Sequence, residues 1–237
     1  MRRVPALSRL AREPPRLRLD RALIPRTPLV VPLRPAEAQS TVHGSRFRAW
    51  LGAAGDPDAA ARALADRETV APDATHHCWA YRVWSDGRVD GTGFDAGEPA
   101  GTAGRPILGS MERAGVVQAV CVVSRWFGGV KLGTGGLARA YGEAARAALQ
   151  AARAEGALAA VEERLAFGVG FEYPLSGAVM RVVSRFAARE TGARYGARVA
   201  LELSITPERA DAFRRAIGEA TAGAVTVDEL GSRLESA

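Results

Sequence analysis

Residues 125–137 read Arg125-Trp126-Phe127-Gly128-Gly129-Val130-Lys131-Leu132-Gly133-Thr134-Gly135-Gly136-Leu137. Five glycines in nine residues disfavour a regular helix or strand, because glycine loses more backbone freedom on ordering than any other residue. We therefore expect a loop here. The apolar, β-branched run before it, residues 116–123, predicts a buried strand, and the Ala-rich run after it, residues 137–153, has apolar residues at helical spacing. The stretch thus predicts strand, glycine loop and helix in that order.

Lys131 is the only lysine of the chain, whereas the other 31 basic residues are arginines. An ammonium group is not interchangeable with a guanidinium fork. Bare backbone N–H groups at a helix N-terminus can hold an anion, so we predict a phosphate- or nucleic-acid-binding loop. Its candidate residues are Arg125, Gly128, Gly129, Lys131, Gly133, Thr134, Gly135 and Gly136. The other open interpretation is that the glycines only form tight turns and let the helix pack closely on the sheet.

Formal nucleotide-binding templates fit this loop poorly. A P-loop requires lysine followed by Ser or Thr after the last glycine, but here Lys131 precedes the Gly-Thr-Gly-Gly run. Residues 133–138 match Gly-x-Gly-x-x-Ala, yet the loop is too long for the tight first turn of a dinucleotide-binding fold. We therefore predict no cofactor.

A second loop, residues 95–106, is also rich in small residues. The loop carries two carboxylates, a hydroxyl and a guanidinium, which we predict to border the same site together with His77 of the strand before it. These loop residues are Asp95, Glu98, Thr102 and Arg105. The alternative is that the acids cap the helix expected to begin near Pro106 and form a salt bridge. Two acids do not make a metal site, and we predict neither a metal ion nor a catalytic residue.

Composition bounds the class of protein. With 237 residues and 47% hydrophobic residues, the chain can bury one large core or two modest ones. No apolar run reaches the 18 or more residues of a membrane span, so we expect a cytoplasmic protein without a membrane partner. Cys78 and Cys121 fall on predicted strands without metal-ligand spacing, which favours buried free thiols.

The positive charge is concentrated at the start of the sequence. Residues 1–40 hold nine arginines, three acidic residues and seven prolines, so the remaining residues have 23 basic and 23 acidic side chains. We expect residues 1–40 to be a disordered basic extension, which either contacts RNA or an acidic surface or is a dispensable tail. A nucleic-acid site in the body would be a local patch rather than a global field.

Local signals predict the elements of the first domain. Residues 45–51 alternate like a strand, and Asp56 and Pro57 start a helix that runs to about Glu68. Residues 76–84 form a strand with His77, Trp79, Tyr81 and Val83 on one face and Cys78, Ala80, Arg82 and Trp84 on the other. Asp86-Gly87 turns this strand into another over residues 88–94.

Taken together, residues 76–82, 95–108 and 122–142 resemble the signature of the IMPACT/YigZ family in content, order and spacing. The resemblance covers about residues 41–150. Small departures are Ala96 where the family usually has an acid, Ala100 for Ser and Trp126 for Tyr. It implies an α+β protein whose first domain, residues 41–155, has the fold shared by a small-subunit ribosomal protein domain and domain IV of elongation factor G.

The second domain is expected over residues 161–232. We expect strands over 165–171 and 224–227, one or two strands over 195–205, and helices over 175–190 and from Thr206-Pro207. This order suits a ferredoxin-like sandwich. This is similar to the C-terminal domain of bacterial IMPACT/YigZ proteins. Its aromatic residues suit a core better than a base-stacking platform, which stays open as an alternative. They are Phe167, Phe171, Tyr173 and Phe186.

Three functions are open at this point. The first is a non-enzymatic, translation-associated protein that binds RNA, the ribosome or a translation protein, which the resemblance implies by analogy of fold. The second is a phosphate- or nucleotide-dependent small-molecule enzyme, with His77 as acid or base and Glu98 orienting either His77 or the substrate. The alternative for His76 and His77 is that they are a structural pair. The third is a pure protein-partner module. The kinase-restraining role of eukaryotic members depends on an additional N-terminal domain and is not expected here.

Overall fold

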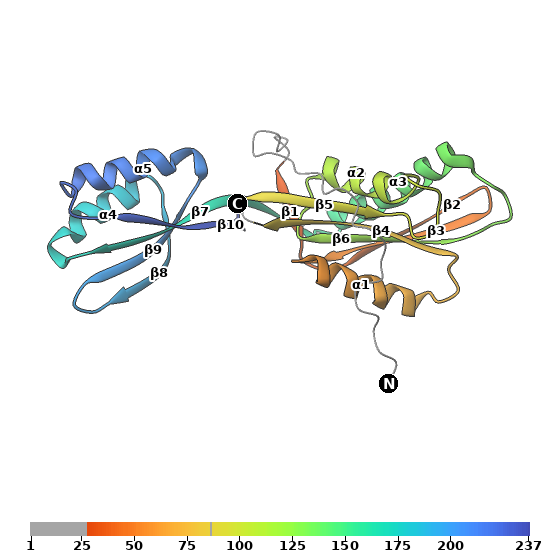
Figure 1. Ribbon diagram of the computed structural model, residues 1–237, viewed down its shortest axis with the longest axis horizontal. Coiled ribbons are helices and arrows are strands. Elements are labelled where there is room, and N and C mark those ends of the chain that lie inside the picture. The colour runs from red at the N-terminus through yellow and green to blue at the C-terminus, as the bar shows by residue number, and fades with distance from the viewer. Residues whose placement is uncertain (1–27, 86) are drawn as a thin grey trace. The chain divides into compact units, whose positions relative to one another are not determined.

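The computed structural model describes residues 28–85 and 87–237. The described chain divides into two compact units (Figure 1), and the main boundary between them lies at residues 158–159. A short segment, Trp84–Arg88, is grouped with the second unit. The protein is therefore an α+β protein with two antiparallel sheets, as the sequence predicts at this level.

The first unit is built on a sheet with strand order β2-β3-β6-β4-β5. The bounds of its elements are β1 Leu29–Pro32, β2 Ala36–Val42, β3 Ser45–Ala53, α1 Pro57–Val70, β4 His76–Ser85, β5 Arg88–Phe94, α2 Gly104–Ala114, β6 Ala119–Trp126 and α3 Gly133–Ala154. Helices α2 and α3 lie on one face of the sheet and α1 lies on the other (Figure 1). Strand β6 is covered on both faces, which explains its almost uniformly apolar sequence.

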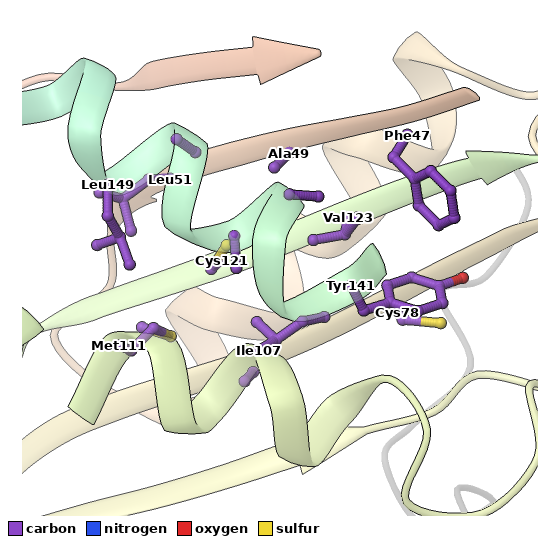
Figure 2. Close-up of a cluster of buried hydrophobic side chains, with 14 of the residues drawn as sticks. Phe47, Ala49, Leu51, Cys78, Ile107, Met111, Cys121, Val123, Tyr141 and Leu149 are labelled. Carbon is purple, nitrogen blue, oxygen red and sulfur yellow. The ribbon is translucent and has the colours of Figure 1, made fainter. Parts of the chain in front are cut away.

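The main core lies between the sheet and helices α2 and α3 (Figure 2). Alternate residues of β4 and β6 enter it, among them Cys78, Cys121 and Val123. The neighbouring residues Trp79 and Val122 face α1 in a smaller core. The two faces predicted for residues 76–84 are confirmed at Cys78 and Trp79, and both cysteines are buried free thiols.

Two expectations for the first unit are wrong. Residues 29–40, assigned to the basic extension, include β1 and most of β2, because the run Leu29-Val30-Val31 pairs its backbone with Gly115 and Val117 despite the flanking prolines. Residues 1–27 lie outside the described part. Helix α3 begins at Gly133, so Gly133, Gly135 and Gly136 form its first turn rather than a loop. Burial of eight residues of α3 in the main core offsets the poor helix propensity of these glycines.

The second unit has a sheet in which β7 lies between β9 and β10, and β8 pairs with β9. Helices α4 and α5 supply buried residues to its core. The bounds are β7 Leu158–Phe171, a 3₁₀ turn η3 Tyr173–Leu175, α4 Ser176–Arg185, β8 Arg189–Tyr195, β9 Val199–Ile205, α5 Pro207–Ala220 and β10 Val227–Ser236. Phe167 and Phe171 are buried and Phe186 packs against the same core, whereas Tyr173 is exposed.

The sequence misplaces several boundaries in this unit, and β7 begins at Leu158 instead of 165. The predicted helix over 175–190 ends at Arg185, because Ala187 adopts a left-handed conformation (φ 51°), and residues 189 and 190 already belong to β8. The closing strand spans 227–236 instead of 224–227. It is polar and held by pairing with β7, so it carries little apolar alternation to detect.

Among the described residues, no helix combines the length and the apolar character needed to cross a membrane.

Candidate anion-binding site

The glycine-rich segment begins where β6 ends and is fixed there by backbone contacts. Phe127 N donates to Thr75 Oγ1 at 3.1 Å, and Gly128 N donates to Ser45 Oγ at 3.2 Å. A Cβ on Gly128 would lie 1.9 Å from the carbonyl carbon of Gly44. Gly128 is therefore required by the close approach of the β2–β3 turn, which is the structural interpretation of this one glycine.

Arg125 is buried and engaged in an ion pair. Its Nη1 donates to Glu98 Oε1 at 2.6 Å, and the two side chains are 6% and 4% exposed. Tyr141 Oη donates to the same oxygen at 2.7 Å, and Arg125 Nη2 donates to Ser45 Oγ at 3.3 Å. The carboxylate neutralises the guanidinium, so Arg125 brings little net charge to an anion. The salt-bridge interpretation of Glu98 is the one that the structure supports.

Burial also sets the protonation of the groups beside this ion pair. Burial raises the pKa of the Cys78 thiol to about 12. Burial, together with Cys78 and Glu98, raises the pKa of Tyr141, so its hydroxyl stays a donor. Figure 2 shows Tyr141 and Cys78 lying together at one end of the core. Neither group is activated as a nucleophile.

The second loop is organised by Asp95. Its Oδ1 accepts from Ala103 N and Gly104 N, both at 2.9 Å, and its Oδ2 accepts from Gly101 N at 2.8 Å. The carboxylate thus satisfies backbone donors at the start of α2, as the capping interpretation predicts. Thr102 is buried and donates to Pro99 O at 2.7 Å. Both side chains are engaged inside the loop.

The two loops and α3 together form a cleft of about 260 Å³. Five of the candidate residues line it: Glu98, Arg125, Lys131, Gly133 and Thr134. Four further lining residues were not singled out by the sequence analysis: Pro99, Phe127, Leu132 and Leu137. The only feature of the sequence that could have indicated Phe127 as a lining residue is the position of an aromatic side chain inside a glycine-rich segment.

The other candidates lie outside this lining. Gly129 has φ 88° and serves the turn, while Gly135 and Gly136 belong to the first turn of α3 beside it. Arg105 is exposed at the start of α2. Gly128, Asp95 and Thr102 have the structural roles given above.

His77 lies on the opposite face of the sheet from the cleft. It is paired with Ser124, and its Nδ1 is 2.8 Å from Ser124 Oγ, whereas Arg125 is paired with His76. Because successive side chains of a strand alternate between faces, Glu98 cannot orient His77. The version of the enzyme hypothesis in which Glu98 orients His77 is therefore wrong. His76, whose Nδ1 is 2.9 Å from Ala96 O, is the histidine on the cleft face.

Lys131 and the N-terminus of α3 are the features with free capacity for an anion. Lys131, Gly133 and Thr134 are exposed, and α3 has neither a side-chain cap nor an acid in its first turn. The first N–H groups of a helix have no intrahelical acceptor, and the helix dipole favours a negative charge there. Within the described residues, no three His, Cys, Asp or Glu side chains are grouped so as to hold a metal ion.

Comparison with known proteins places both units in one family. The profile described as Impact N-terminal domain matches residues 43–149, and that described as Domain of unknown function (DUF1949) matches residues 169–224. A solved structure titled "Crystal structure of an hypothetical protein" aligns with a TM-score of 0.53 and 27% identity, covering 84% of this chain and 95% of that one.

Among curated proteins, the chain is 38% identical over 113 residues to the IMPACT family member YigZ of Escherichia coli strain K12. The aligned segment covers 47% of this chain and 55% of that protein. The match thus spans about half the length of that relative. It is 31% identical over 165 residues to an IMPACT family member of Haemophilus influenzae, which covers 67% of this chain and 76% of that protein. One profile matches the first unit and the other matches the second, and the match to the Haemophilus influenzae protein covers more than two thirds of that protein. The chain therefore belongs to the IMPACT family.

Proposed function

We propose that this protein is a non-enzymatic, cytoplasmic binding protein of the translation apparatus, which contacts RNA phosphates through Lys131 and the first turn of α3. The observation that carries the proposal is the space around Gly135 in that turn. Gly133 is accounted for by its left-handed φ of 67°, whereas a Cβ on Gly135 would meet only the end of Arg139, at 3.9 Å.

Gly135 has no explanation inside the fold. Its φ is not in the left-handed region, and it lies in a helix, where glycine costs about 1 kcal/mol relative to alanine. An alanine there would stabilise the isolated protein. A glycine favours instead the close approach of an external group to the backbone N–H groups, which is how helix N-termini hold phosphates.

The charge of the site agrees with a phosphate ligand. The ion pair of Arg125 and Glu98 contributes no net charge, so Lys131 and the α3 dipole leave the cleft positive. Each phosphate neutralised by a lysine releases counterions, which makes binding dependent on salt. The charge of the cleft thus predicts that binding of RNA weakens as the salt concentration rises.

The fold of each domain, taken by itself, supports a role in translation by analogy. The pairing of β10 with β7, of β7 with β9 and of β9 with β8, together with two helices, supports the proposal of a ferredoxin-like sandwich. Together with a first domain similar to domain IV of elongation factor G, it suits contact with RNA, the ribosome or a translation protein.

The proposal is tested by fluorescence anisotropy with a labelled 12-nucleotide single-stranded RNA over a salt series. We expect Lys131→Ala to lower affinity and to reduce the slope of log K against log[salt] by about 0.7, the value of one phosphate contact on a single strand. Gly135→Ala should weaken binding while leaving the melting temperature equal or higher.

The matched control is Gly177→Ala, in the first turn of α4, where the added Cβ meets only the end of Arg181 at 3.6 Å. This variant should bind RNA like the wild type. The proposal would be refuted if the RNA affinity of the wild type did not depend on salt, or if the Lys131→Ala variant bound RNA with unchanged affinity. Selective binding of a mononucleotide would favour an enzyme, and binding of no anion would favour a protein-partner module.

A further inference from the structure

Phe127 is an exposed aromatic residue on the rim of the cleft. Its side chain is 49% exposed, although it immediately follows the buried strand β6. Aromatic side chains carry large apolar surfaces and usually bury them. Phe127 lines the cleft together with Lys131 and Thr134, so an apolar ring lies beside the groups that attract an anion.

The backbone of Phe127 is held in place. Its N–H donates to Thr75 Oγ1, and the next residue, Gly128, packs directly on Gly44. The guanidinium carbon of Arg125 lies 5.6 Å from the centre of the Phe127 ring. The ring is therefore presented from a fixed point, which reduces the entropy that a ligand loses when it binds there.

The wall of the cleft also offers a hydrogen-bond acceptor. Glu98 lines the cleft with a side chain that is only 4% exposed. Its Oε1 accepts from Arg125 and Tyr141, whereas its Oε2 accepts no hydrogen bond from any described residue. The side chain lines the cleft, so this oxygen offers an acceptor to a ligand that carries an N–H or O–H group, as bases and riboses do.

The size of the cleft limits the ligand. Pockets that enclose a drug-sized molecule usually measure about 300–1,000 Å³, and this cleft is smaller, at about 260 Å³. It suits one unit of a longer chain whose neighbours lie outside. In a duplex the bases are stacked inside the helix and are not available to a protein ring, whereas unpaired bases stack readily on aromatic side chains.

We propose that the cleft binds one nucleotide of single-stranded RNA, with the unpaired base stacked on Phe127 beside the phosphate held by Lys131 and the first turn of α3. This rests on the proposed function and adds to it the form of the RNA and the residue that selects it. The aromatic contact is independent of charge, so its loss leaves the salt dependence of binding intact.

The experiment uses the full chain and three probes: a single-stranded 12-nucleotide RNA, the same sequence as a duplex, and inorganic polyphosphate, which has no base. We expect Phe127→Ala to weaken single-stranded RNA binding at least five-fold, with the salt slope unchanged. Binding of duplex and polyphosphate should not change. Phe127→Tyr should bind like the wild type, because it keeps the ring.

The matched control is Val130→Ala, which shortens another exposed apolar side chain of the same segment, 53% exposed and outside the cleft lining. It should have no effect on any probe. The inference alone is overturned if Phe127→Ala binds single-stranded RNA like the wild type while Lys131→Ala still lowers binding. If the wild type binds none of the three probes, the proposed function itself fails.

Discussion

Replacing Glu98 by Gln removes one charge from the buried pair with Arg125 while keeping the shape of the side chain and an acceptor for Tyr141. The guanidinium, 6% exposed, then has no counter-charge at 2.6 Å. Breaking a buried ion pair by removing one partner costs about 3–5 kcal/mol. Because the glutamine amide retains the hydrogen-bond acceptor, we expect a loss at the lower end, about 3 kcal/mol, in the free energy of unfolding. Arg125→Met should cost a similar amount.

The assay is urea unfolding followed by tryptophan fluorescence, since Trp50, Trp79 and Trp126 all belong to the first unit. The double variant Glu98→Gln/Arg125→Met should lose about 1–3 kcal/mol less than the sum of the single variants, because neither charge is then left unpaired. The control is Glu37→Gln, which removes the charge that Arg48 and Arg67 share at a site where Glu37 is 33% exposed, and it should cost at most about 1 kcal/mol. Additive single losses, or a Glu98→Gln loss as small as that of the control, would refute this account.

Two further predictions concern packing and the thiols. Gly128→Ala should destabilise the first unit by about 2 kcal/mol or more in the same urea assay, because its Cβ would overlap the Gly44 backbone; a loss below that of Glu37→Gln would contradict the close approach. Burial raises the pKa of Cys78 and Cys121 from 9.0 to about 12, so the folded state keeps both protons while the unfolded state loses them. Their contribution to stability is therefore complete below about pH 9 and falls between pH 9 and 12, by about 1.4 kcal/mol per pH unit for each thiol; a Cys78→Ala/Cys121→Ala variant should show a correspondingly flatter decline in denaturation from about pH 9 to 11.

Elements with local signals were predictable from the sequence. Asp56 accepts from Ala59 N at 2.6 Å and α1 begins at Pro57, as the cap and the proline indicate. Strand β4 and the separation of its faces follow from alternation alone. In these segments the residues that specify the element lie within it, so neighbours distant in the sequence are not needed to recognise them.

The site depended on contacts that no local pattern contains. Glu98 and Arg125 are 27 positions apart and meet only when β6 and the second loop are assembled. The first turn of α3 is helical despite its three glycines, because packing of the rest of the helix in the core outweighs their poor helix propensity. The sequence therefore located Lys131 and the segment around it, but no local pattern indicated that Arg125 is buried and paired with Glu98.

Because of the order of the elements along the chain, the two units can complete their folding at different times during synthesis. All helices of the first unit, and every strand of its sheet, are complete once residue 154 has been made. The second unit needs β10, which begins 73 residues later and covers residues 161–169 of β7. At about 5–20 residues per second, the first unit has roughly 4–15 s in which to fold before β10 exists. Even after β9 has been made and paired with β7, the edge of β7 that β10 covers stays unpaired until β10 follows, so nascent chains are most exposed to mispairing after the first unit has formed.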